Sequence, residues 1–94
     1  MKFSNKVHHI HFVGIAGIGM SGIAEVLLNL GFRISGSDLS ENDLTKKLSS
    51  FGARIYRGHS AQNIDGAQVI VKTSAAKDDN IEIATARLHN IPII

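Results

Sequence analysis

The sequence has 94 residues, with ten Lys and Arg, eight Asp and Glu, five His, no Cys and 44% hydrophobic residues. A chain of this length buries about 60% of its unfolded surface, which suits one domain over residues 1–94. The lack of cysteine excludes disulfides, cysteine zinc sites and thiol catalysis. The apolar runs fall far short of the roughly 18 residues that a membrane span needs. The cations are scattered without interleaved aromatic residues, so neither membrane insertion nor nucleic-acid binding is expected.

The first half of the chain reads as strand, helix, strand. His8–Val13 is β-rich and leads into a cluster of glycines. Apolar residues then recur at helical spacing from Met20 to Leu30, and Gly31 stands where a C-terminal helix cap belongs. Arg33–Ser37 is predicted to form the second strand.

The second half repeats the alternation. Ser40 is predicted to cap a second helix, whose apolar stripe runs from Leu44 to Phe51 and ends at Gly52. The remaining predicted elements are a third strand at Ala53–Tyr56, a short helical turn at Ala61–Ile64, a fourth strand at Gln68–Lys72, a last helix from Ile81 to Leu88 and a fifth strand at Ile91–Ile94 that the chain end cuts short.

Strands that alternate with helices over short connections indicate an α/β fold. We expect a Rossmann-like, three-layer α-β-α sandwich with a five-stranded parallel sheet whose last strand is truncated. Ligands of such sheets bind beyond the carboxyl ends of the strands, where the strand order reverses. Four loops follow those ends, and they carry the glycine cluster, Asp38, Gly58-His59 and Thr73-Ser74.

The glycine cluster is the clearest motif. The segment from Gly17 to Gly22 fits G-x-G-x-x-G, directly after a predicted strand and at the start of a predicted helix. Glycines let the backbone approach a ligand, and the free N–H groups of a first helical turn attract phosphate. The pattern favours diphosphate binding over a tight turn that holds no ligand.

Asp38 follows the second predicted strand, 21 residues after Gly17. An acidic residue about 20 residues past the glycine turn commonly hydrogen-bonds ribose hydroxyls. The alternative is a turn aspartate that caps the segment before Ser40. Ser37 stands next to Asp38 and could share the ribose contact.

Further polar residues follow the third and fourth predicted strands. His59 and Asn63 lie one helical turn apart and could together contact a base or ribose, although His59 could also be a helix-start residue in water. Thr73 and Ser74 offer hydroxyls and backbone N–H groups to the same edge of the sheet, or cap their own loop.

Three histidines cluster at the start of the first predicted strand, where His9 and His11 share a face. A metal site would need further ligands, and no carboxylate is near in sequence, so we interpret His8, His9 and His11 as the frayed, polar start of a buried strand. The chain also lacks G-x-x-x-x-G-K-[ST], so it carries no P-loop for ATP and Mg²⁺.

Three segments together resemble the Mur ligase family of bacterial peptidoglycan synthesis, and its alanine-adding branch most of all. They are IHFVGIAGIGMSGIAE at Ile10–Glu25, ISGSD at Ile34–Asp38 and GHSAQNI at Gly58–Ile64. The stretch Val71–Ala76 is similar to the family's strand followed by S-S-A. Two positions depart from the family pattern: Ala16 replaces a usual glycine, and Thr73 replaces a frequent serine.

The resemblance implies a three-domain cytoplasmic ligase. Its N-terminal domain binds the UDP part of UDP-N-acetylmuramate, its central domain binds ATP and Mg²⁺, and its C-terminal domain brings the amino acid. The 94 residues would then be an isolated first domain that binds but does not ligate. A murein-peptide-recycling branch of the superfamily is a lesser possibility.

The resemblance also assigns residues. It places Gly17, Ile18, Gly19 and Met20 at the diphosphate, Asp38 at the ribose, and His59, Asn63 and Ser74 on the uridine side. From the residues alone, a small NAD-binding regulatory or dehydrogenase domain fits the glycine turn and Asp38 equally well.

Overall fold

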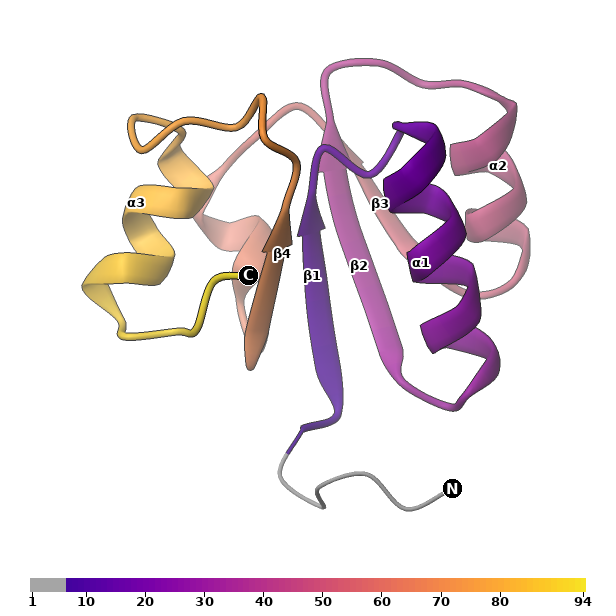
Figure 1. Ribbon diagram of the computed structural model, residues 1–94, viewed down its shortest axis with the longest axis horizontal. Helices are drawn as coiled ribbons and strands as arrows, with labels where there is room; N and C mark the ends of the chain where they lie inside the picture. Colours follow the sequence, from indigo (N-terminus) through magenta and orange to yellow (C-terminus); the bar gives the residue numbers. More distant parts are fainter. Residues whose placement is uncertain (1–6) are drawn as a thin grey trace.

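The computed structural model describes residues 7–94 as a parallel sheet between two layers of helices (Figure 1). The strands stand side by side in the order β3-β2-β1-β4, and each neighbouring pair is parallel. Among residues 7–94, every helix is too short or too polar to span a lipid bilayer. The strand bounds are His9–Val13 for β1, Arg33–Asp38 for β2, Arg54–Arg57 for β3 and Val69–Lys72 for β4.

The helices divide between the two faces of the sheet. Helices α1 (Ile18–Asn29) and α2 (Asp43–Ser50) cover one face, and α3 (Ile81–Leu88) covers the other together with the 3₁₀ turn η1 (Ala61–Ile64) (Figure 1). Strand β1 has β2 on one side and β4 on the other, so the strand order reverses at β1. The carboxyl end of β1 is therefore the place where this fold leaves a crevice.

The start of α2 differs from the prediction, because Asn42 rather than Ser40 caps the helix. The Asn42 side chain accepts a hydrogen bond from Thr45 N at 3.0 Å, and Thr45 Oγ1 accepts one from Asn42 N at 3.1 Å. This reciprocal pair is a capping box in which Thr takes the place of Glu or Gln. Ser40 N instead donates to Asp38 Oδ1 at 3.0 Å, so Ser40 belongs to the turn that follows β2.

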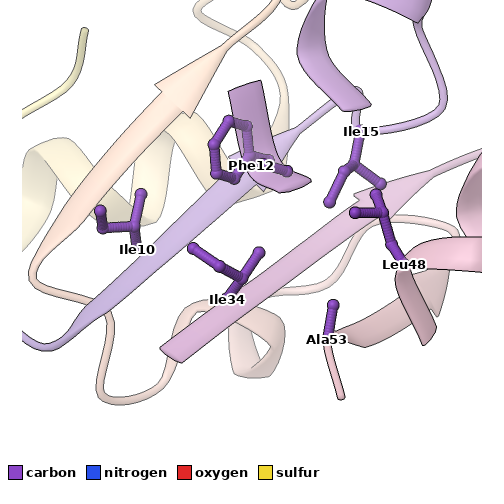
Figure 2. Packing of buried hydrophobic residues seen from close by; sticks show 7 residues of the cluster. Ile10, Phe12, Ile15, Ile34, Leu48 and Ala53 are labelled. Carbon is purple, nitrogen blue, oxygen red and sulfur yellow. The ribbon is translucent and has the colours of Figure 1, made fainter. Parts of the chain in front are cut away.

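Each face of the sheet has its own apolar core. On the α1–α2 face, Ile10 and Phe12 of β1 pack with Ile34 of β2 and Leu48 of α2 (Figure 2). Alternate residues of β1 point to the α3 face, where a second cluster forms. That cluster consists of Val13, Ile64, Ala67, Ile70, Ala76, Ile83 and Ala86. All five residues of β1 are buried. Its two histidines, His9 and His11, therefore need polar partners inside the protein.

The predicted fifth strand is not confirmed, because the described residues form four strands. The segment at Ile91–Ile94 makes a single parallel bridge, between Ile93 and Ile70 of β4. Its hydrogen bonds to β4 all lie close to that bridge: Ile70 N donates to Pro92 O, Ile94 N to Ile70 O, and Lys72 N to Ile94 O. Pro92 has no N–H to donate, so the ladder stays too short to count as a strand.

Candidate functional site

The glycine turn between β1 and α1 presents unused backbone donors. Gly17 is the N-cap of α1 and has no side chain to cap it. Ser21 N is the first amide of the turn to find an intrahelical partner, Gly17 O at 2.8 Å. The N–H groups of Ile18, Gly19 and Met20 precede it and form the free N-terminus of a 12-residue helix. Such a helix end attracts anions.

Asp38 holds this turn in place from the end of β2. Its Oδ2 accepts a hydrogen bond from Ala16 N at 2.9 Å, while its Oδ1 accepts one from Ser40 N at 3.0 Å. On the other side of the loop, Asn42 Nδ2 donates to Ala16 O at 3.0 Å. The turn-aspartate role considered for Asp38 is therefore present, and it leaves the half-buried carboxylate at the edge of the glycine turn.

Gly14 lets the ends of β1 and β4 approach each other. Its N–H donates to Ser37 O at 2.8 Å, and Thr73 N donates to Val13 O at 3.0 Å. Gly14 has φ +89°, and a Cβ there would overlap Thr73 Cγ2 and lie 3.1 Å from Thr73 Cβ. Only glycine fits both this backbone angle and this space.

A cleft of about 550 Å³ opens at the carboxyl ends of the strands, a size typical of small-molecule sites. Its wall includes four of the predicted site residues: Gly17, Asp38, His59 and Thr73. The loop after β4 forms the opposite side. The other lining residues are Val13, Gly14, Leu39, Ser40, Ala75, Ala76, Lys77, Asp79 and Asn80.

The other predicted site residues lie beside or beneath this cleft. Ile18 and Ser74 are chain neighbours of lining residues, and Gly19 and Met20 follow Ile18 in the first turn of α1, but none of the four lines the cleft. Ser37 is completely buried, and Asn63 turns its amide toward the interior, where Nδ2 donates to Gly58 O at 3.2 Å and to Glu82 at 2.8 Å. The structure thus places Ser37 and Asn63 in the support of the cleft rather than on its surface.

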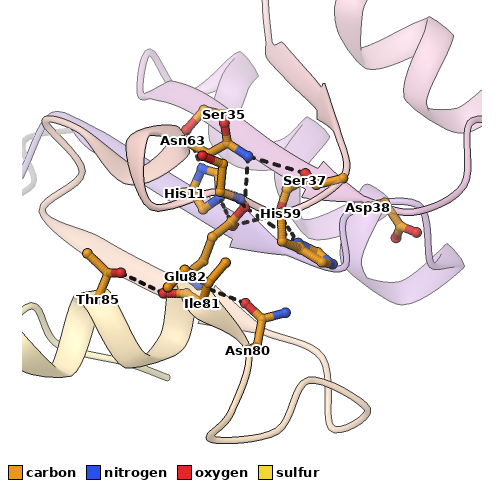
Figure 3. Close-up of polar contacts among 12 residues, drawn as sticks. His11, Ser35, Ser37, Asp38, His59, Asn63, Asn80, Ile81, Glu82 and Thr85 are labelled. Carbon is orange, nitrogen blue, oxygen red and sulfur yellow. Dashed lines mark hydrogen bonds and ion pairs between the residues drawn. The ribbon is translucent and has the colours of Figure 1, made fainter.

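Glu82 of α3 is the centre of that support and was not identified from the sequence. It is fully buried, and its carboxylate accepts four hydrogen bonds of 2.6–3.1 Å (Figure 3). Burial alone would raise the pKa of Glu82, but the hydrogen bonds outweigh it and lower that pKa to about 2. The carboxylate is therefore ionised at neutral pH. The four donors are His11 Nε2, Ser37 Oγ, Ser60 N and Asn63 Nδ2.

The histidines of β1 extend this network toward the amino end of the sheet. The Ser35 hydroxyl lies 2.7 Å from both His9 Nε2 and His11 Nδ1. Burial lowers the pKa of His9, although a hydrogen bond to the Gly66 backbone opposes the shift. With His9 neutral and its other nitrogen protonated toward Gly66, Ser35 donates to His9 and accepts from His11. The network therefore runs from His9 through Ser35 and His11 to the Glu82 carboxylate.

The frayed-start interpretation of the histidines is consequently wrong for His9 and His11, which are 8% and 0% exposed. His8 is exposed. The partner carboxylate comes from 71 residues further along the chain. The sequence carried one partial signal: His9 and His11 alternate on β1, and Ser35 and Ser37 alternate on β2, so each strand places two polar side chains on one face. Residues 7–94 contain no group of three or more His, Asp or Glu side chains that could hold a metal ion.

The Glu82 network predicts a loss of stability in acid. Its folded pKa is about 2 against 4.5 for an unperturbed Glu, so its contribution is complete above pH 4.5 and is lost as the pH falls to about 2. A shift of this size corresponds to about 3 kcal/mol. Urea unfolding at a series of pH values should show this decrease, and a free energy of unfolding that stays constant from pH 4.5 to pH 2 would contradict it.

Comparisons with known proteins agree with the resemblance seen in the sequence. The sequence model described as "Mur ligase family, catalytic domain" matches residues 9–94. The UDP-N-acetylmuramate–L-alanine ligase of Methylobacillus flagellatus is 60% identical over 90 residues, covering 96% of this chain and 19% of that protein. The ligase of the same name from Magnetococcus marinus is 61% identical over 89 residues, again covering 19% of its length.

Solved structures show the same fold. A UDP-N-acetylmuramate-alanine ligase from Thermotoga maritima superposes with a TM-score of 0.87 at 42% identity, over 90% of this chain and 20% of that one. A UDP-N-acetylmuramate:L-alanyl-gamma-D-glutamyl-meso-diaminopimelate ligase from Neisseria meningitides gives 0.85 at 30% identity, over 94% and 28%. The chain spans about a fifth of the length of the curated relatives it matches. By the match over residues 9–94 and these identities, the chain belongs to the Mur ligase family.

Proposed function

We propose that this chain binds the UDP part of UDP-N-acetylmuramate, as the N-terminal domain of an ATP-dependent ligase that adds L-alanine in peptidoglycan synthesis. The observation that carries the proposal is the free N-terminus of α1 beside a cleft that Asp38 and His59 also line. The names of the relatives supply the substrate class. Those names give no support to the alternative of an NAD-binding regulatory or dehydrogenase domain.

In this proposal the diphosphate lies at the turn formed by Gly17, Ile18, Gly19 and Met20, and it accepts hydrogen bonds from the free N–H groups of Ile18, Gly19 and Met20. The helix N-terminus supplies partial positive charge, and the first turn of α1 has no acidic residue to oppose it. Asp38 and His59 face the nucleoside, and Thr73 lines the cleft at the start of the loop after β4. Ser74, the next residue of that loop, is assigned to the uridine side. Ser37 and Asn63 contribute from beneath, through the Glu82 network.

The ligation step itself belongs to the rest of the longer protein in this proposal. The 94 residues contain no G-x-x-x-x-G-K-[ST] segment, the P-loop that cradles the phosphates and Mg²⁺ of ATP. We therefore assign ATP and Mg²⁺ to a central domain and the amino acid to a C-terminal domain. This chain would bind and orient the nucleotide sugar without transferring a group, in the bacterial cytoplasm.

Two matched glycine variants of α1 test the phosphate assignment. An added Cβ meets no atom within 4 Å at either Gly19 or Gly22, so valine should leave the fold intact at both. A helical Cβ points toward the helix N-terminus, so a side chain at residue 19 would enter the proposed diphosphate position. We expect Gly19→Val to weaken UDP binding about 10- to 100-fold, the loss of one charge-assisted hydrogen bond or more. Gly22→Val lies one turn further on and should bind normally.

Calorimetric titration of the unsubstituted chain (the parent) and both variants with UDP, and of the parent with NAD, would test the phosphate assignment and the proposed function. A parent that binds NAD to saturation and does not bind UDP would overturn the proposed function. Equal UDP affinity of the two folded variants would overturn the position of the diphosphate. Asp38 is a less clear test, because removing its carboxylate also releases Ala16 and Ser40 and so disturbs the turn itself.

A further inference from the structure

The buried carboxylate of Glu82 is connected to the cleft through Ser37 and His59 (Figure 3). We infer that Glu82 is a positioning residue: through Ser37 it fixes which ring nitrogen of His59 carries the proton, and it thereby makes His59 an acceptor for a hydrogen-bond-donating group of the ligand. The assignment of the His59 proton to one ring nitrogen depends only on the contacts in this structure. Its effect on UDP binding rests on the proposed function.

The direction of the hydrogen bond between Ser37 and Glu82 is determined by proton counting. Ser37 Oγ lies 2.6 Å from Glu82 Oε1, and both side chains are completely buried. An ionised carboxylate only accepts hydrogen bonds, whereas a hydroxyl has a single proton to donate. Ser37 must therefore donate its hydroxyl proton to Glu82, and it can only accept a hydrogen bond from any other neighbour.

That neighbour is His59. Its Nδ1 lies 2.9 Å from Ser37 Oγ and 3.5 Å from Glu82 Oε2. Both oxygens are acceptors in this arrangement, so the proton must be on Nδ1. A neutral imidazole has one N–H, and Nε2 is then left with a lone pair. The buried network thus selects the Nδ1–H tautomer of His59.

The remaining nitrogen is available to a ligand. The His59 side chain is 20% exposed and lines the cleft together with Asp38. Figure 3 shows the ring reaching away from Glu82 on the side of Asp38. An acceptor nitrogen and a carboxylate on one wall favour a ligand that presents donors there, such as a ribose hydroxyl or a nucleobase N–H. A carboxylate or phosphate of the ligand only accepts hydrogen bonds, and neither the Asp38 carboxylate nor His59 Nε2 could donate one to it.

The substitution Glu82→Gln should reverse this arrangement. The amide can satisfy the fixed N–H of Ser60 and the side chain of Asn63 only if its oxygen takes the Oε2 position. Its NH₂ group then occupies the Oε1 position and donates to Ser37. The Ser37 proton becomes free to point at His59 Nδ1, so His59 would adopt the Nε2–H tautomer and present a donor to the cleft.

Nitrogen-15 NMR of histidine-labelled protein measures the tautomer directly. At about pH 8, where a free imidazole is neutral, we expect His59 in the parent to be protonated on Nδ1 and in Glu82→Gln on Nε2. Ser35→Ala is the matched control, because Ser35 is a buried hydroxyl of the same strand and network but contacts His9 and His11 instead. It should leave the His59 tautomer unchanged.

Titration with UDP supplies the second measurement. Glu82→Gln should bind UDP about 3- to 10-fold more weakly than the parent, the effect of one hydrogen bond, and Ser35→Ala should bind it equally well. An Nε2–H tautomer in the parent would overturn the inference, and this test needs no variant to fold. Equal UDP affinity of the parent and a Glu82→Gln protein with reversed tautomer would overturn the role toward the ligand. A parent with the Nδ1–H tautomer that does not bind UDP would contradict the proposed function while supporting the orientation of His59.

Discussion

Replacement of Glu82 by alanine should lower the free energy of unfolding by about 3–5 kcal/mol, because it leaves several buried donors without an acceptor. The carboxylate accepts hydrogen bonds from three segments: His11 on β1, Ser37 on β2, and Ser60 and Asn63 around η1. Alanine can replace none of these contacts. Glu82→Gln should be milder, since an amide of the same size can still hydrogen-bond to Ser37, Ser60 and Asn63.

Urea denaturation followed by circular dichroism would measure the change. Glu25→Ala is the matched control, because Glu25 also forms an ion pair, with Lys47 Nζ at 3.2 Å, but on the surface. The side chains of Lys47 and Glu25 are 55% and 34% exposed, and pairs of this kind contribute at most about 1 kcal/mol. A Glu82→Ala protein as stable as Glu25→Ala would show that the buried network does not hold the domain together.

Substitution of Gly14 by alanine should cost about 2–4 kcal/mol of folding free energy. Two effects combine: φ is +89°, where a Cβ is strained, and the new methyl group would overlap the Thr73 side chain. Gly14 also anchors the first strand through its hydrogen bond to Ser37 O. Because Gly14 and Thr73 both line the cleft, any shift that relieves the overlap should also weaken UDP binding.

A double-mutant cycle separates the two effects. Thr73→Ser removes the Cγ2 that the new methyl group would overlap but leaves the backbone angle as it is. In the Thr73→Ser background, Gly14→Ala should therefore cost about 1–2 kcal/mol, because the strained backbone angle and the close contact with Cβ of residue 73 remain. Equal costs in both backgrounds would show that overlap with Thr73 Cγ2 contributes nothing.

The fold could be predicted from the sequence to a large extent, because its signals are local. Apolar segments between glycines marked β1 to β4 to within one or two residues, and helical spacing marked α1 and α3. The differences have local causes as well. Asn42 rather than Ser40 caps α2, because the helix begins at Asp43 and Ser40 lies in the turn after β2. The segment at Ile91–Ile94 has strand-forming residues, but its ladder to β4 reduces to one bridge.

By itself, the sequence determined the glycine turn, the position of Asp38 after β2 and the family, because each depends on residues adjacent in the chain. Only the tertiary structure decided that His11, Ser37, Ser60 and Asn63 share Glu82 as their common acceptor. A strand pattern shows which side chains share a face, but not which residue of a distant helix meets that face. The partner of a buried polar group is selected when β1, β2 and α3 pack together, since only then do donors lose water and need a protein acceptor.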